Sequence, residues 1–477
     1  MTVDIQGRVE SRVQKALRAR QLAETASLQP SSLSPTQPDV ELCSRLQLIL
    51  SRTPGEELVS SELCRSPSTD WTANAVSTFF ADWIVPSNLL VENTSYLPDL
   101  CYGSGKSLCL DRALSAAAFA NQSNRYGLGW AAFEARKAYG RAVSALATAL
   151  QDPVEATKDS TLAALHLMIA GYLPTGRLMD VHHHRGRMAL LRLRGSQQFN
   201  TSTGRALFRV THEHAILKCL LRHENPLPEA GSWFDLIGIQ TPSQEMARLG
   251  IRTTRLCAEI QALFDTPAQD QAWAQGLLSA ILLGFQLDAD FQSWIDEHAC
   301  SPERGYAVQP PPPGLVVPSA QMLYLFRDCW LANTWMGCFS KRAHLHEVLL
   351  HCFALLNLDA NNKAHADSLS MSYVQENDVC LQSQRIIADM IYGICASIPC
   401  ILGMVDFWGQ MSKPETRKPL GGYLSIWPLH VARASCEEGS ERDIWLKSMQ
   451  VSLSQDYGLR FAMHMARRTK TQPWDLK

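Results

Sequence analysis

The sequence has almost no net charge. Across 477 residues, 44 Lys and Arg face 46 Asp and Glu, a formal net charge of −2. A globally basic nucleic-acid binder is therefore excluded, although a local basic segment is not. With 46% hydrophobic and 19% charged residues, the chain is too apolar for a disordered protein. It is also long enough to bury a large core.

Long apolar runs are missing too. No run reaches the roughly 18 residues needed to span a bilayer. The best candidate, 391–405, is interrupted by Ser397 and Pro399 and bounded by Asp389 and Asp406. This pattern predicts a buried helix end. The N-terminal residues contain no apolar segment of the kind found in secretory signals, so we expect neither secretion nor membrane insertion.

None of the 14 cysteines forms a C-x-x-C pair. They are spread over the chain, and most lie in apolar, helix-like surroundings such as 325–339. Without a secretory signal, this distribution favours free, buried, reduced thiols in an intracellular protein.

Helical periodicity is the strongest positive pattern. Between residues 129 and 150, apolar side chains recur at intervals of three and four, which is one face of a helix. Asp152 then suits a helix cap, Pro153 the first helical position and Glu155 the third. A second helix should follow and end at 174–176. We expect an antiparallel pair whose common core contains Tyr139, Val143, Leu146, Leu162, Leu165 and Ile169.

Similar helical patterns continue to the C-terminus, over 203–222, 243–264, 269–299, 320–356, 377–396 and 442–467. No alternating pattern indicates a strand, and no fixed period indicates a repeat array. The fold is therefore predicted to be all-α, an irregular stack of antiparallel helix pairs in a single large helical domain.

Three segments are expected along the chain. Residues 1–38 form a basic N-terminal helix and a Ser/Pro linker, and 39–110 form an irregular lead-in with one short helix over 71–84. Residues 111–470 form the all-helical domain. The proline run at 310–313 is expected to act as a stiff spacer between two halves of that domain.

Two segments are locally basic. Residues 1–20 carry five basic and two acidic side chains, and 177–209 carry seven arginines and one acid. Both suit an anionic partner such as phosphate, nucleic acid or an acidic protein surface. The alternative for 177–209, which we favour, is that the arginines pair with acids elsewhere in the fold. The candidate residues for an anionic partner are Arg8, Arg12, Lys15, Arg18, Arg20, Arg185, Arg187, Arg192 and Arg194.

Three motifs suggest specific chemistry but fail on spacing or context. Residues 103–107 (GSGKS) resemble a phosphate-binding loop, but Leu100 replaces the required first glycine and no strand is predicted before it. His346 and His351 are five residues apart, which turns the second ring away from the face that a zinc site needs. The rings of 182–184 (HHH) diverge on a helix, so a loop with exposed histidines at the start of a helix is favoured there, with metal binding as the second alternative. No catalytic, cofactor-binding or metal-binding residue is assigned, and no cofactor is expected.

Several separate blocks resemble one family in its own order. They are KAYGRA at 137–142, ALQDP at 149–153, DSTLAA at 159–164, HHRG at 183–186, LLRLRG at 190–195, ADMIYGICASIP at 388–399, IWPL at 426–429 and RDIW at 442–445. Over about 70–465 the chain resembles the fungal-specific transcription factor domain, the regulatory region of binuclear zinc-cluster regulators. The resemblance implies an all-α regulatory domain, a nuclear location and control of a fungal gene set, often a biosynthetic cluster. It implies no catalytic residues.

The chain departs from that family in one respect. The zinc cluster of such regulators uses six cysteines in two C-x-x-C halves, whereas the first cysteines here are Cys43 and Cys64. The leading hypothesis is therefore a regulator without its own zinc cluster, which binds other transcription regulators, or DNA through its basic segments. A homodimer stays open, and so does a gene model that misses an upstream exon. The alternative is a pathway enzyme of specialised metabolism built on the same all-α scaffold.

Overall fold

Helices form most of the computed structural model. It describes residues 70–84, 96–103, 107–169, 181–237, 241–266, 271–318, 320–358 and 373–467. Within these ranges the fold is all-α, as predicted, with one two-stranded sheet. The basic helix and Ser/Pro linker expected at 1–38 lie outside the described residues, and so do Arg8, Arg12, Lys15, Arg18 and Arg20.

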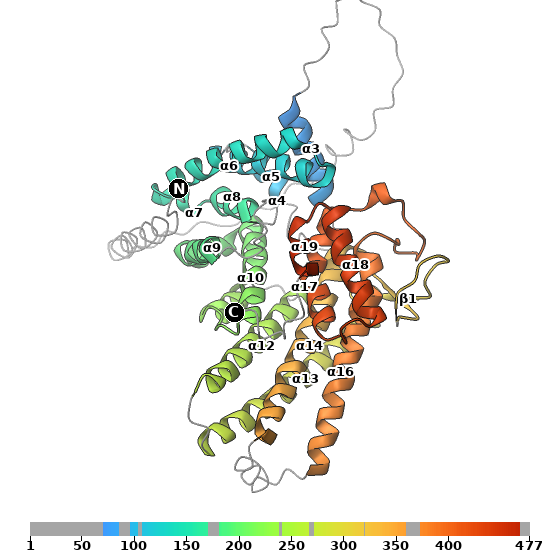
Figure 1. Ribbon diagram of the computed structural model, residues 1–477. Coiled ribbons are helices and arrows are strands. Elements are labelled where there is room, and N and C mark those ends of the chain that lie inside the picture. Colours follow the sequence, from blue (N-terminus) through green and yellow to red (C-terminus); the bar gives the residue numbers. More distant parts are fainter. Residues whose placement is uncertain are drawn as a thin grey trace, which may run out of the picture.

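The first group of helices packs around α5, in the upper part of Figure 1. The helices α5 and α6 form an antiparallel pair, and α5 also contacts α3 and α8. Between α5 and α6, Gly127 takes a left-handed conformation (φ 69°) that a glycine adopts without strain. The elements are α3 (Trp71–Trp83), α4 (Tyr96–Tyr102), α5 (Leu108–Tyr126), α6 (Gly129–Ala149), α7 (Pro153–Thr157), α8 (Asp159–Ile169), α9 (Val181–Arg194), η1 (Gly195–Asn200) and α10 (Ser202–Arg222).

The second group is built on long helices that pack side by side in the lower and right-hand parts of Figure 1. The main contacts join α12 to α13, α13 to α14, and α14 to both α16 and α17. The elements are α11 (Ala230–Ile237), α12 (Pro242–Phe264), α13 (Gln271–His298), β1 (Ala307–Gln309), β2 (Leu323–Leu325), α14 (Cys329–Leu358), α16 (Tyr373–Ile401), η2 (Pro414–Thr416), α17 (Pro419–Ala434), α18 (Glu441–Gln455) and α19 (Arg460–Arg467).

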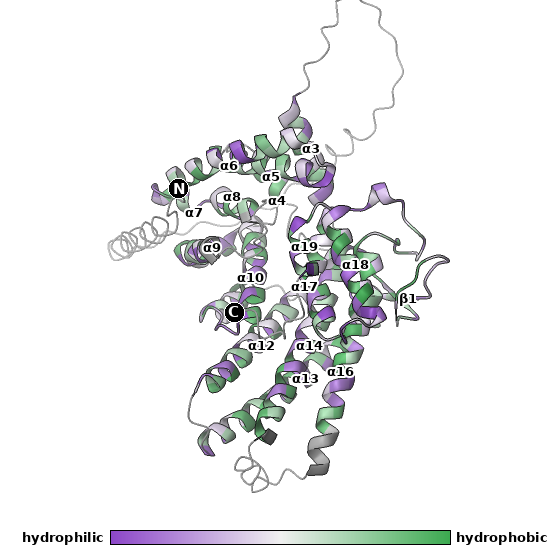
Figure 2. Cartoon of the chain, in the orientation of Figure 1, coloured by the Kyte–Doolittle hydropathy of each residue, from purple (hydrophilic) through white to green (hydrophobic). Residues whose placement is uncertain are grey.

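One hydrophobic core joins the two groups. Helix α3 contacts α17, where the Trp83 and Tyr423 rings meet edge to face with centroids 5.8 Å apart. Arg125 pairs with Asp82 on α3 and also donates to the Arg417 carbonyl oxygen at 3.0 Å. The buried apolar residues of this core come from helices of both groups, and hydrophobic and hydrophilic residues are interspersed along these helices (Figure 2). The described helices therefore form a single domain.

The expected core of 129–169 is confirmed for three of its residues. Leu146, Leu162 and Leu165 are buried in the shared core, and Tyr139 and Val143 pack half-buried against it. The side chain of Ile169 lies outside the described residues. The predicted cap also forms, since Asp152 Oδ1 accepts a hydrogen bond from the Val154 N–H at 2.8 Å.

Two predicted helices are wrong in extent. The helix expected over 442–467 is two helices, because Gly458 adopts a φ of 72° with the Arg125 backbone too close for a side chain. The helix expected to run on from Pro153 is also two, because Lys158 is extended between α7 and α8.

The segment 320–328 is not helical, contrary to the sequence prediction. Leu323 and Leu325 are buried on either side of a half-buried Tyr324, and this short alternation forms β2, which pairs antiparallel with β1. Helix α14 begins only after Asp328, whose Oδ1 accepts from the Trp330 and Leu331 backbone N–H groups. The proline run 310–313 lies in the long connection between β1 and β2. It does not separate two halves, because α13 and α14 pack directly against each other.

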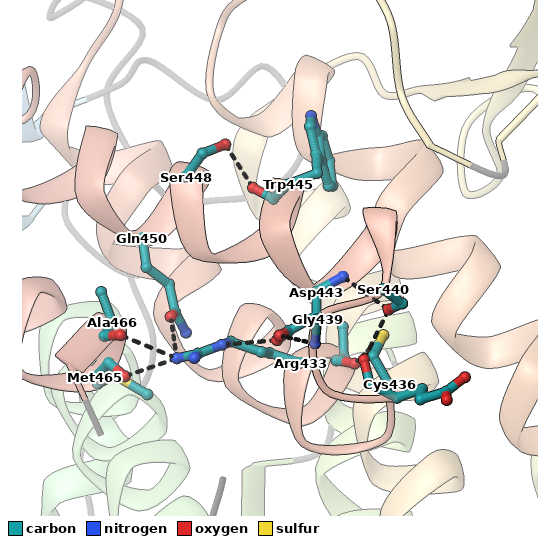
Figure 3. A network of polar contacts seen from close by, with 12 residues as sticks. Arg433, Cys436, Gly439, Ser440, Asp443, Trp445, Ser448, Gln450, Met465 and Ala466 are labelled. Carbon is teal, nitrogen blue, oxygen red and sulfur yellow. Dashed lines mark hydrogen bonds and ion pairs between the residues drawn. The ribbon is translucent and has the colours of Figure 1, made fainter. Parts of the chain in front are cut away.

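Arg433 connects the last three helices, α17, α18 and α19, through hydrogen bonds (Figure 3). Its Nε donates to Asp443 Oδ1 at 3.1 Å, and its Nη1 donates to Gln450 Oε1 at 3.2 Å. The same nitrogen donates to the Met465 and Ala466 carbonyl oxygens on α19, at 3.0 and 3.3 Å. One guanidinium on α17 therefore holds α18 through its side chains and α19 through the carbonyls of its last turn.

One long apolar helix lies partly in the core. Val379–Ile401 of α16 is long and apolar enough to cross a membrane by length and composition alone, and 56% of that window is buried in the fold. Several thiols are buried as well: Cys109, Cys219, Cys257, Cys338, Cys352 and Cys395. Burial raises the pKa of the Cys257, Cys338 and Cys352 thiols to about 12, so they are neutral near pH 7.

Candidate functional site

The arginines of 181–209 do not form one basic surface. Arg194 is buried and pairs with Asp159, and Arg192 is exposed and lies 3.5 Å from Glu229. For these two, the prediction of pairing with acids elsewhere in the fold is confirmed. Arg185 is exposed. Arg187, on the same helix α9, instead points into the interior, where only 4% of it is exposed to solvent.

Arg187 lines a cavity of about 150 Å³ between the two groups of helices. Side chains from α9, α10, α12, α14 and α17 surround it. Its apolar wall consists mainly of Ile216, Leu220, Met246, Ile426, Trp427 and Pro428. An engineered cavity of this size, about 150 Å³, admits a benzene molecule, so a small organic compound fits here.

A chain of hydrogen bonds forms the polar wall. Arg187 Nη1 lies 3.1 Å from His214 Nδ1, and His214 Nε2 lies 2.8 Å from Tyr423 Oη. A guanidinium nitrogen only donates, so His214 Nδ1 must accept, and the ring proton is assigned to Nε2. This proton is donated to the Tyr423 oxygen. The Tyr423 hydroxyl hydrogen then has no acceptor among the described residues.

Burial keeps the neighbouring histidine His166 and the tyrosine neutral. The His166 ring stacks on the His214 ring with centroids 5.2 Å apart, and burial lowers the pKa of His166 to about 3. Burial also raises the pKa of Tyr423 to about 12. Neither of these two neighbours therefore supplies a negative charge to Arg187 at pH 7.

His212 lies in the same wall with its polar atoms unsatisfied. It is 2% exposed, and neither ring nitrogen has a hydrogen-bond partner among the described residues. Its ring packs on Phe208 and Phe234, and burial lowers its pKa to about 3. A neutral imidazole of this kind still offers one donor and one acceptor.

Lys341 is the second cationic side chain of the cavity. Its ammonium lies against Gly337, 3.1 Å from where a Cβ of that residue would stand, and its stem lies against Gly250. These two positions without side chains make room for the lysine. Burial lowers the pKa of Lys341, and the Glu213 carboxylate on the cavity wall opposes that shift. Glu213 thus supplies a counter-charge for Lys341.

The three sequence motifs carry other roles in the structure. Ser107 caps α5, and the helix α4, instead of a strand, precedes the glycine-rich loop, so the context of a phosphate-binding loop is missing. His346 bonds to Ser383, whereas the His351 ring packs edge to face on Phe264. The side chains of 182–184 lie outside the described residues.

The fold brings together one Ser–His–Asp arrangement that the sequence did not reveal. His346 Nδ1 lies 3.0 Å from Ser383 Oγ, and His346 Nε2 lies 2.8 Å from Asp288 Oδ1. Arg342 also holds Asp288 through two hydrogen bonds, of 2.6 and 3.2 Å. Ser383 and His346 are both fully buried, so no substrate reaches the hydroxyl in this structure. The group links α13, α14 and α16 as a buried polar network.

A second hollow, of about 600 Å³, is lined by residues of α5, α6 and the segment 155–160. Its charged residues include Arg112, Arg141 and Lys158, and Lys158 pairs with Glu155. These side chains are solvated, which makes this hollow a weaker candidate than the inner cavity.

Comparison with known proteins adds no relative: no family model matches the chain, and neither a curated protein nor a solved structure is significantly similar to it.

Proposed function

We propose that the protein is a transcriptional regulator, or a co-regulator without its own zinc cluster, of a fungal gene set such as a specialised-metabolite cluster. It would act in the nucleus by binding another regulator, with its basic segments as weak contacts to DNA. The proposal combines the sequence resemblance with the all-α architecture and with one feature of the surface.

That feature is a group of exposed aromatic side chains on α3 and α6. Trp71, Trp130 and Phe133 are 58%, 42% and 60% exposed. The Trp71 and Trp130 rings contact each other with centroids 5.2 Å apart, and Phe133 follows Trp130 by one helical turn. Large aromatic residues that stay in water at this density are typical of protein-binding surfaces. This aromatic surface is the observation that carries the proposal.

The surface suits a protein partner better than DNA. Aromatic anchors supply binding energy when a partner's apolar side chains remove them from water. Duplex DNA offers a charged backbone instead, which binds basic side chains and not apolar aromatic rings. The partner is therefore expected to present apolar side chains. Another regulator or a second copy of this chain meets that description, and light scattering of the purified protein distinguishes them.

A pathway enzyme is the second candidate, and the inner cavity favours it. Catalytic sites gather buried ionisable groups in an apolar cavity, and Arg187, His212, His214, Lys341 and Tyr423 form such a group. A regulator would need the aromatic surface for its function in the cell, whereas an enzyme would need the inner cavity.

The test is complementation of a deletion strain. Phe133→Glu places a charge on the aromatic surface, and Leu282→Glu places the same charge on α13, at a residue that is 64% exposed. We expect wild type and Leu282→Glu to restore transcripts of the gene set, and Phe133→Glu to leave them low although the protein accumulates. Full restoration of the transcripts by Phe133→Glu would show that the aromatic surface is not needed for regulation.

A further inference from the structure

Arg187 is a buried cation without a counter-ion. Its pKa, which burial lowers to about 10, still leaves it charged at pH 7. Among the described residues, no carboxylate lies within ion-pair distance of it. Its one hydrogen-bond partner there is the neutral His214, and its Nε has none.

Such an arrangement is unusual because a buried charge is strongly unfavourable unless an opposite charge accompanies it. The other buried arginine of α9 follows this rule, since Arg194 pairs with Asp159. For Lys341, across the cavity, the Glu213 carboxylate opposes the lowering of its pKa by burial. No carboxylate acts on the pKa of Arg187 in this way, and the empty space beside Arg187 is where a counter-ion would lie.

The polar wall offers mainly donors to that space. Arg187 has unused N–H groups, and the Tyr423 hydroxyl hydrogen is left over once His214 has donated to its oxygen. His212 adds a buried ring with no partner among the described residues. Donors on residues that line one cavity, one of them charged, match the oxygen atoms of a carboxylate.

The remaining wall of the cavity is apolar, so the part of the ligand beyond its carboxylate should be apolar as well. Met246, Ile426 and Trp427 face the same cavity, which has the volume of about one aromatic ring. An inorganic anion would leave this wall uncovered, and a neutral hydrocarbon would leave Arg187 without a counter-ion.

We propose that the cavity binds a small organic carboxylate, with its carboxylate on Arg187 and Tyr423 and its apolar body against Met246, Ile426 and Trp427. This site is separate from the aromatic surface on α3 and α6. The carboxylate proposal can therefore be wrong while the proposed function is right, and the proposed function can be wrong while the carboxylate proposal is right.

The test uses benzoate and its neutral analogue benzamide on the purified full-length protein. Titration calorimetry and the thermal unfolding midpoint are measured for both compounds at pH 7.4. We expect benzoate to bind at least tenfold more tightly than benzamide and to raise the midpoint. Equal effects of the two compounds would overturn the role of Arg187 as the counter-charge.

Variants locate the binding. Arg187→Met should weaken benzoate binding at least tenfold and leave benzamide unchanged, whereas Arg192→Met, the same change on the exposed face of α9, should leave both unchanged. Tyr423→Phe removes only the hydroxyl and should weaken benzoate about three- to tenfold, which keeps the test valid if Arg187→Met does not fold. Unchanged benzoate binding in both Arg187→Met and Tyr423→Phe would overturn the site. Inorganic phosphate that binds as tightly as benzoate, with the same dependence on Arg187, would overturn the organic part of the proposal.

Discussion

Tyr423 accepts a hydrogen bond from His214 across 2.8 Å, although 209 residues separate the two in the chain. This contact joins α10 of the first group of helices to α17 of the second. It also fixes the proton positions, which leave the hydroxyl hydrogen of Tyr423, a residue that lines the central cavity, without an acceptor among the described residues. The two groups of helices therefore meet at a polar site, although most of the interface around it is apolar.

The core prediction for 129–169 is testable by truncation. Leu165 is 3% exposed, and Leu165→Ala removes a buried isopropyl group from the core. We expect a loss of about 2–5 kcal/mol in the free energy of unfolding, measured by urea denaturation. The control is Leu282→Ala, the same change at a residue that is 64% exposed, where we expect less than about 0.5 kcal/mol. Similar losses in both variants would show that Leu165 is not part of the core.

Glu347 should make stability depend on pH near neutrality. Burial raises its pKa to about 7, even though the Ser435 hydroxyl donates to it. A raised carboxyl pKa stabilises the folded state below the unfolded pKa, and this contribution is lost as the pH rises through about 7. Glu347→Gln should therefore gain about 2–3 kcal/mol relative to wild type between pH 5 and pH 8, measured by denaturation at each pH. Exposed Glu297→Gln is the control, and a gain that does not grow with pH would contradict the raised pKa.

DNA binding, where it occurs, should be non-specific. Arg187 and Arg194 are buried, so the remaining contacts would come mainly from the basic side chains of 8–20. Five phosphate contacts would make the affinity fall by roughly two to three orders of magnitude between about 50 and 200 mM salt. Anisotropy titrations should give the same curve for a promoter duplex and a scrambled one, since phosphate contacts carry no base information. A promoter-specific footprint that survives at high salt would reveal a reading element elsewhere in the chain.

Local signals in the sequence were enough to predict the all-α fold and much of its helix pairing. Periodicity located α6, α10 and α12 within about two residues, and the Asp152–Pro153 pair marked a cap that forms as expected. The wrong predictions concern places where a predicted helix is interrupted over a few residues. The three-residue alternation around Tyr324 is too short to stand out beside a long helix. The break at Gly458 depends on its close approach to Arg125, more than 300 residues earlier.

The candidate site was predictable only in part. The run of arginines in 177–209 drew attention to Arg187, but the sequence does not distinguish an arginine that pairs with Asp159 from one that faces a cavity. That difference depends on which way each side chain points on α9. His212, Lys341 and Tyr423 come from three other helices, so only the folded chain brings them to Arg187.

The most direct test of the central proposal is the transcript profile of a deletion strain, measured together with its metabolites. A regulator acts on a set of genes through its surface, whereas an enzyme acts on one compound through its cavity. We predict that deletion lowers transcripts across the gene set and abolishes the product without accumulation of an intermediate. Normal transcripts together with one accumulating intermediate would contradict the regulator and identify the protein as a pathway enzyme.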